Sequence, residues 1–127
     1  MNCMVSFIIL NYNTPDITAQ CVQSIETFYG NEDYEIIIVD NHSEQANYER
    51  LVQLNQGRHQ IIRSKLNTGF GLGNMLGAEQ ASGDYLCFLN SDVQLVEDCI
   101  TPLVEYLSTH SEVGVITPQQ YRPNGNS

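Results

Sequence analysis

Short polar side chains recur at four places in this sequence, each soon after a run of apolar residues. The four segments are Asn11-Tyr12-Asn13, Asp40-Asn41-His42-Ser43, Asn67-Thr68-Gly69-Phe70-Gly71 and Asn90-Ser91-Asp92. Amides and hydroxyls donate and accept hydrogen bonds, and carboxylates also bind hard cations. One such segment would be ordinary for a loop, but the set of four points to a binding site for a polar ligand.

The apolar runs before these segments predict buried β-strands. They are rich in Ile, Val, Leu and aromatic residues and are of strand length. The predicted strands cover residues 5–10, 35–39, 60–63, 85–89 and 113–116. The first, second and fourth are continuously apolar, which is typical of strands that are buried on both faces of a sheet.

Helical spacing separates the strands. Thr14 is a good N-cap and Pro15 suits the first turn, so a helix is predicted to start there and to end near Gly30. Its expected buried positions are Ile17, Cys21, Ile25 and Phe28. Ser43 is the predicted cap of a second helix.

The third crossover contains several glycines. Residues 67–73 predict a glycine-rich turn, followed by a helix that stops at Gly83. A last helix is expected over residues 101–109. The order of elements is therefore β-α-β-α-β-α-β-α-β.

Such alternation predicts an α/β fold with a mostly parallel sheet and helices on both faces. Ligands of open parallel sheets bind outside the carboxyl ends of the strands, where all four polar segments would lie. Residues 1–118 form the expected domain, and residues 119–127 a polar tail. Asn124-Gly125 is a hairpin signal close to the last residue, so we expect a fragment of a longer chain, with a frayed polar terminus as the alternative.

The charge balance excludes several classes of partner. The net charge is -10, with only 5 Lys and Arg residues, so a nucleic acid or an anionic membrane is not an expected partner. A phosphate ligand would need backbone amides or a metal ion. No apolar run approaches the roughly 18 residues of a membrane span. Four cysteines without metal-ligand spacing suggest reduced thiols and a cytoplasmic location.

Several nucleotide-binding signatures are missing. The glycines at Gly69, Gly71 and Gly73 do not form G-x-G-x-x-G and follow the third strand rather than the first. There is no P-loop, no acidic pair after the first strand as in phosphorelay receivers, and no Gly- and Arg-rich loop as in sugar nucleotidyltransferases.

The ordered set of motifs resembles the inverting glycosyltransferases of family 2 with the Rossmann-like GT-A fold, especially the rhamnosyltransferase-like branch. The similarity extends to about Pro118 and rests on residues 5–13, 38–43, 67–74 and 83–92. Each motif alone is weakly specific, whereas the set at these spacings is strongly specific. The resemblance implies a UDP- or dTDP-sugar donor and a glycan or lipid-linked saccharide as acceptor, in polysaccharide or cell-surface glycan synthesis.

The resemblance also implies roles for individual residues. Asp40 would accept a hydrogen bond from the imide N–H of uracil or thymine. Asn90-Ser91-Asp92 stands at the D-x-D position, where Asp92 would ligate Mg²⁺ or Mn²⁺; Asn90 replaces the first acid. The remaining implied donor-binding residues are Asn11, Asn13, Asn67, Gly69, Phe70 and Asn74. Asp40, Asp92, Asn67 and Asn74 could instead serve only as caps or turn formers.

An inverting transferase also needs a general base. The resemblance implies a carboxylate in the second half of the family's domain, beyond residue 127, so this chain would bind the donor without transferring sugar by itself. A non-catalytic nucleotide-binding or interaction module with the same fold is the alternative, and another nucleotide-binding α/β protein a third. The sugar, the acceptor and the oligomeric state stay open.

Overall fold

The computed structural model describes residues 4–29, 34–67 and 69–110. The chain divides into two compact units, Met1–Val96 and Glu97–Ser127. The elements of the first unit are β1 (Val5–Asn11), α1 (Pro15–Phe28), β2 (Tyr34–Asp40), α2 (Gln45–Asn55), β3 (Gln60–Arg63), α3 (Gly69–Gln80) and β4 (Tyr85–Asn90). In the second unit, α4 (Ile100–Thr109) is described, with Ile100 and Val104 buried.

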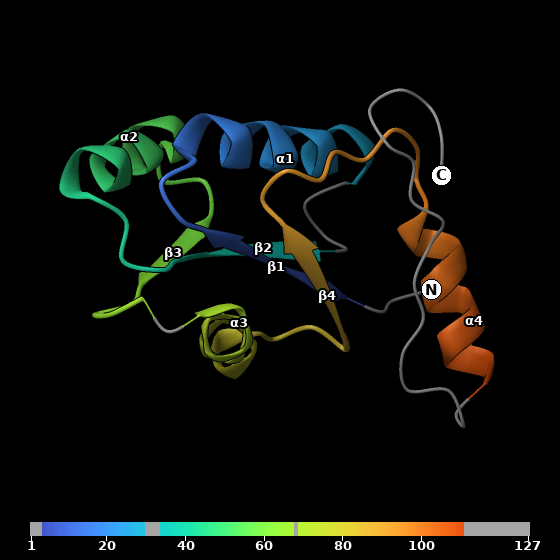
Figure 1. The fold of residues 1–127 in the computed structure, drawn as a ribbon. Coiled ribbons are helices and arrows are strands. Elements are labelled where there is room, and N and C mark those ends of the chain that lie inside the picture. Colours follow the sequence, from blue (N-terminus) through green and yellow to red (C-terminus); the bar gives the residue numbers. More distant parts are fainter. Residues whose placement is uncertain (1–3, 30–33, 68, 111–127) are drawn as a thin grey trace. The chain divides into compact units, whose positions relative to one another are not determined.

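The four strands form one parallel sheet in the order β3-β2-β1-β4. Helices α1 and α2 cover one face, and α3 covers the other (Figure 1). The predicted α/β class, with helices on both faces of a parallel sheet, is confirmed. Because all strands are parallel, their carboxyl ends lie at one edge of the sheet, which we call the rim.

Each face of the sheet has its own core. On the α1 side, the ring of Phe7 contacts Tyr29 and Tyr34 at centroid distances of 5.5 and 6.0 Å. On the α3 side, Ile8, Ile37 and Val39 form a fully buried cluster, and the residues packed against it are Leu10, Ile62, Leu76, Ala78 and Ala81. These apolar side chains leave water together and fix the strands whose ends make the rim.

Helix α3 lies unusually close to the sheet. A Cβ at Gly77 would lie 2.5 Å from Cγ2 of Ile8, and one at Gly73 would lie 2.5 Å from Cδ1 of Leu10. The glycines thus serve close packing within a helix. The predicted turn over residues 67–73 is wrong in its second part, since α3 begins at Gly69, and the helix ends at Gln80 rather than at Gly83.

The two predicted helix caps have different outcomes. Thr14 holds the predicted N-cap position of α1, although its side chain makes no capping hydrogen bond. The prediction for Ser43 is wrong, because Glu44 holds the N-cap position of α2. Both hydroxyls bind polar groups of other elements instead. In α1 the buried face includes Thr18, Cys21, Val22 and Ile25, whereas Ile17 and Phe28 are exposed.

Strand β4 is the last strand of the sheet among the described residues, and it differs from the prediction of complete burial. Its residues alternate between partly buried and exposed, with Leu86 44% and Phe88 46% exposed. The predicted strand over residues 113–116, the helix end at Gly30 and the tail at 119–127 lie outside the described residues. None of the described helices has the length and apolar character needed to cross a membrane.

Candidate nucleotide-sugar site

The carboxylate of Asp40 is the centre of a buried polar network at the ends of β1 and β2. Asn11 and Asp40 are register partners in the sheet, and both are fully buried. Asn11 Nδ2 donates to Asp40 Oδ1 at 2.9 Å, and the backbone N–H of Ser43 donates to Oδ2 at 3.2 Å. The Ser43 hydroxyl also donates to Oδ1. A contact between Asp40 and a nucleobase would therefore have to share an oxygen that already has an internal donor.

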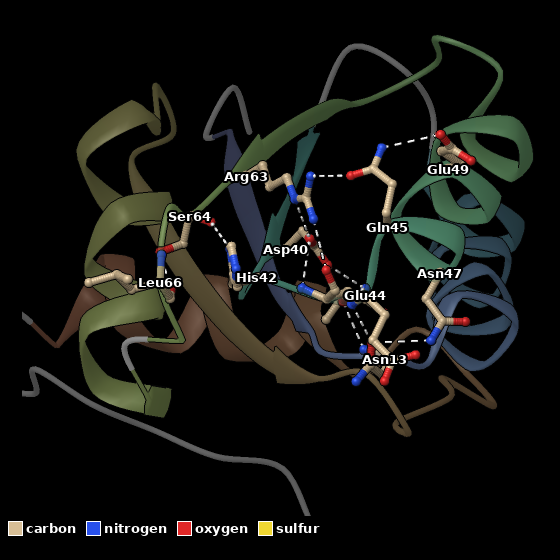
Figure 2. Close-up of polar contacts among 12 residues, drawn as sticks. Asn13, Asp40, His42, Glu44, Gln45, Asn47, Glu49, Arg63, Ser64 and Leu66 are labelled. Atoms are coloured by element: carbon tan, nitrogen blue, oxygen red, sulfur yellow. Dashed lines mark hydrogen bonds and ion pairs between the residues drawn. The ribbon is translucent and has the colours of Figure 1, made fainter.

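Arg63 completes this network from β3, where it is the register partner of Asp40. Its Nε lies 3.4 Å from Asp40 Oδ2, and its Nη2 donates to the Ser43 carbonyl at 2.8 Å. Nη1 donates to Gln45 Oε1 at 2.9 Å (Figure 2). The guanidinium also lies 4.3 Å from the ring centroid of Tyr48. The guanidinium thus links the end of β2 to the start of α2, on either side of the loop after β2.

Asn13 connects the loop after β1 with the start of α2. Its φ of 56° places it in the left-handed region, where Asn is among the more tolerated residues. Its Oδ1 accepts the backbone N–H of Glu44 at 2.8 Å and Nδ2 of Asn47 at 3.1 Å (Figure 2). Asn13 therefore supplies an acceptor to the exposed amides at the start of α2.

The loops after β2 and β3 are joined by two amides. Asn41 Nδ2 donates to Asn67 Oδ1 at 2.9 Å, and the same oxygen accepts the backbone N–H of Gly69 at 3.1 Å. Gly69 opens α3 with a φ of 78° and would meet nothing within 4 Å if it carried a Cβ. Asn74 is 8% exposed, and its buried Oδ1 has no hydrogen-bond partner among the described residues. Phe70 lies in the first turn of α3; its side chain is outside the described part.

The end of β4 is open by comparison. A surface hollow of about 430 Å³ is lined by Leu10, Thr14, Ile17, Asn90, Ser91 and Asp92. The predicted D-x-D-like segment therefore contributes all three of its residues to a single concave surface. Asp92 is exposed, and no salt bridge among the described residues uses it.

A buried thiol lies next to one residue of this hollow. Cys21 of α1 is fully buried, and its Sγ lies 4.0 Å from the Asn90 carbonyl oxygen. Burial raises the pKa of the Cys21 thiol to about 12, and the negative charges of Cys87 and Asp92 contribute to the rise. A thiol with such a pKa stays protonated and unreactive at neutral pH.

Thr14 connects the two ends of the rim. Its hydroxyl lies 3.3 Å from Asn11 Oδ1 and 3.3 Å from the hydroxyl of Ser91. Thr18 also donates to Asn11 Oδ1, at 2.6 Å. The hydrogen-bonded pair of Asn11 and Asp40 is therefore connected to the hollow by side-chain contacts as well as by the backbone.

The hollow could hold a divalent cation only if a bound ligand supplied some of the coordinating atoms. The described residues contain no group of three His, Cys, Asp or Glu side chains that could hold a metal ion. Mg²⁺, however, is commonly bound by one or two carboxylates together with substrate phosphates. The exposed Asp92 satisfies that smaller requirement, with Asn90 and Ser91 as neutral oxygen donors beside it.

Sequence reasoning missed three residues of the rim. From the sequence, Thr14 and Ser43 are expected as helix caps, and Arg63 has no assigned role. A usable signal existed for Arg63: it is one of only 5 basic residues, and it stands at the carboxyl end of a predicted strand. Its pairing with Asp40 depends on β3 lying beside β2, which the sequence pattern alone does not specify.

Comparison with known proteins agrees with this geometry. The parallel sheet with helices on both faces matches the fold of GT-A glycosyltransferases among the solved structures. The model of the family "Glycosyl transferase family 2" matches residues 6–127, so the chain belongs to that family. Dolichol-phosphate mannosyltransferase of Pyrococcus furiosus is 26% identical over 112 residues, which are 87% of this chain and 32% of that protein.

Solved structures share the fold at low identity. A mannosyltransferase from Pyrobaculum calidifontis, in complex with GDP-Man and Mn²⁺, has a TM-score of 0.77 at 15% identity over 85% of this chain. S. aureus TarS 1–349 in complex with UDP-GlcNAc has a TM-score of 0.72 at 18% identity over 91% of this chain. The chain covers 33% and 37% of those two chains. It thus spans about a third of these relatives.

Proposed function

We propose that this chain is the donor-binding part of a glycosyltransferase, which binds a nucleoside diphosphate sugar across the rim. The observation that carries the proposal is the hollow after β4, into which Asn90, Ser91 and the exposed carboxylate of Asp92 are brought together. Its second support is the family of the chain. Two solved structures with this fold hold nucleotide sugars, GDP-Man in one and UDP-GlcNAc in the other.

The two ends of the rim suit the two ends of such a donor. Strands β2 and β4 are separated by β1, so their ends lie roughly 10 Å apart at the usual spacing of strands. The amide-rich loops after β2 and β3 offer donors and acceptors for a base. The open hollow after β4 offers one carboxylate for a cation that neutralises a diphosphate.

In this proposal, Asp92 holds Mg²⁺ or Mn²⁺ together with the diphosphate. The bound cation would stabilise the negative charge of the leaving nucleotide. The net charge of -10 makes this supply of positive charge important, since few cationic side chains are available. We also assign Asn11, Asn13 and Asp40 to the nucleotide-binding region. There Asp40 would act chiefly by holding the loop that follows it.

Finer features are carried by the resemblance of the motifs. We propose a UDP- or dTDP-sugar donor, transfer with inversion in the manner of the rhamnosyltransferase-like branch, and a glycan or lipid-linked acceptor. The general base is expected outside the described residues. Free thiols at Cys21 and Cys99 support a cytoplasmic location.

The test is a calorimetric titration of the purified 127-residue chain with UDP, dTDP and GDP, each with and without Mn²⁺. The expected result is binding of a pyrimidine nucleoside diphosphate that strengthens with Mn²⁺ and loses this strengthening in Asp92→Ala. Selective binding of GDP would keep the donor site and correct the base. A folded chain that binds none of the three would overturn the proposal in favour of a non-catalytic interaction module.

A further inference from the structure

We propose that Arg63 is a positioning residue of the nucleotide site, which holds the loop of residues 41–45 in the shape that receives the base. The inference rests on the proposed function, because it assigns this loop to the base end of a nucleotide donor. It gives a role to a side chain that has no place among the family-derived site residues.

The guanidinium of Arg63 is used by four groups of the protein. Nη2 and Nη1 donate to the Ser43 carbonyl and to Gln45 Oε1, at 2.8 and 2.9 Å. Nε lies 3.4 Å from Asp40 Oδ2 (Figure 2). The planar group lies over the Tyr48 ring, 4.3 Å from its centroid. A planar fork with fixed N–H directions can serve several acceptors at once, which a lysine cannot do.

These contacts fasten the loop at both of its ends. Asp40 precedes the loop and Gln45 begins α2, while the Ser43 carbonyl lies between them. The backbone in between is not relaxed, because His42 has a φ of 63° in the left-handed region. An arrangement that costs conformational energy persists only when its surroundings hold it, and Arg63 supplies two of the hydrogen bonds that hold this loop.

Direct contact of Arg63 with a diphosphate is the competing role, and the geometry disfavours it. β3 and β4 are the first and last strands of the described sheet, three strand spacings apart, so Arg63 and the Asn90–Asp92 hollow lie roughly 14 Å apart at the usual spacing of strands. Arg63 is not among the residues that line the hollow. Its side chain is 29% exposed, and its N–H groups are directed at protein acceptors.

The experiment compares the affinity of the chain for uridine, UMP and UDP, the last with and without Mn²⁺, in Arg63→Ala and Arg63→Lys. Arg58→Ala is the matched control, since Arg58 also joins two elements, through Glu26 at 2.7 Å, but in the loop that precedes β3, away from the rim. Hydrogen exchange of the backbone amides of residues 41–45 is followed in the same proteins. Arg63→Lys keeps a positive charge beside Asp40 and stays informative if Arg63→Ala fails to fold.

If Arg63 positions the loop, its replacement should weaken the binding of all three ligands to the same extent. Affinity for uridine, UMP and UDP should each fall about tenfold in Arg63→Ala, with the gain from Mn²⁺ unchanged and with faster exchange over residues 41–45. Arg63→Lys should show the same pattern at smaller size, and Arg58→Ala should leave both measurements unchanged.

Other patterns overturn the inference. A loss that is absent for uridine and grows from UMP to UDP would make Arg63 a phosphate ligand. Wild-type affinity in both Arg63 variants would leave it without a role in the site. If the wild-type chain binds none of these ligands, the proposed function itself fails, and the role of Arg63 in nucleotide positioning fails with it.

Discussion

The two ends of the rim are built differently. At the end of β2, Asp40 is fully buried; its two oxygens accept hydrogen bonds from Asn11 and Ser43, and Arg63 forms an ion pair with it, with Nε 3.4 Å from Oδ2. At the end of β4, Asp92 is exposed at the edge of an open hollow. Both are aspartates that follow a strand of the same sheet, yet the first is saturated by the protein and the second is available to a ligand.

The two aspartates therefore have different roles: Asp40 stabilises the structure of the rim, and Asp92 is available for binding. A carboxylate that is satisfied internally sets the shape of a loop before any ligand arrives, which lowers the ordering cost of binding. A carboxylate that faces solvent contributes little to stability but can accept a cation. Four experiments test this difference between the two carboxylates.

The largest effect is expected on the reactivity of Cys21, next to the open end. Its raised pKa means that the folded chain binds the thiol proton more tightly than the unfolded chain does. The associated stability is complete below pH 9 and is lost as the pH rises toward 12. At pH 8, alkylation by iodoacetamide should be roughly a thousandfold slower in the folded chain than in urea.

Peptide mass spectrometry of the alkylated chain measures this rate at Cys21 alone. Asp92→Asn should increase the folded-state rate slightly, since the charge of Asp92 contributes to the raised pKa. Equal rates in the folded and unfolded chain would mean that the Cys21 thiol is open to solvent.

Asp40→Ala should destabilise the chain by about 3 kcal/mol. The substitution leaves the Arg63 guanidinium and the amide of Asn11 without their shared acceptor in a buried place. Urea denaturation measures the change. Asp16→Ala is the control, because the Asp16–Arg50 pair is exposed on both sides and should contribute less than about 1 kcal/mol. Equal losses in Asp40→Ala and Asp16→Ala would show that the buried Asp40 network stabilises the chain no more than an exposed ion pair does.

Asp92→Asn should give the opposite pattern. Unfolding free energy should change by less than about 0.5 kcal/mol, because the side chain is exposed. Affinity for UDP in the presence of Mn²⁺ should fall about tenfold, or 1.4 kcal/mol, with little change when Mn²⁺ is absent. Calorimetry with Asp16→Asn as the control checks this. A Mn²⁺ effect that survives the substitution would place the cation elsewhere.

Thr14→Val should have the smallest effect and tests whether the two ends are coupled. The change keeps the shape of the side chain and removes the hydroxyl between Asn11 and Ser91. We expect a loss of about 1 kcal/mol in unfolding free energy and an affinity for UDP about threefold lower. Thr27→Val is the matched control, since the Thr27 hydroxyl binds only a carbonyl of its own helix. Identical behaviour of the two variants would show that the ends act independently.

Much of the fold was predictable because its signals are local. Continuous apolar runs identified β1 and β2, and the alternation of strands and helices required a parallel sheet with its carboxyl ends together. That topology alone brings Asn11 beside Asp40. The residues that the family resemblance implies as ligands of donor and metal stay predictions, since no ligand contact has been observed for them.

The missed features depend on contacts between distant segments. Ser43 and Thr14 have good capping side chains, but buried acceptors at Asp40 and Asn11 were stronger partners than the helix ends. The glycines of α3 have low helix propensity, and tertiary packing against Ile8 and Leu10 offsets that cost. The partial exposure of β4, including that of Phe88, could not be predicted from its apolar composition, because it depends on which elements pack against the strand.

The glycines of α3 also limit how this domain can be engineered. Replacing a helical glycine by alanine ordinarily stabilises a protein by about 1 kcal/mol. Gly73 and Gly77 cannot accept a methyl group without displacing Leu10 or Ile8, and Gly69 has a φ that alanine disfavours. Gly71 meets open space, so it is the one position of the three-residue pattern Gly69, Gly71, Gly73 where thermal tolerance can be raised. An alanine at Gly71 would therefore raise heat resistance without displacing a neighbouring side chain of the sheet.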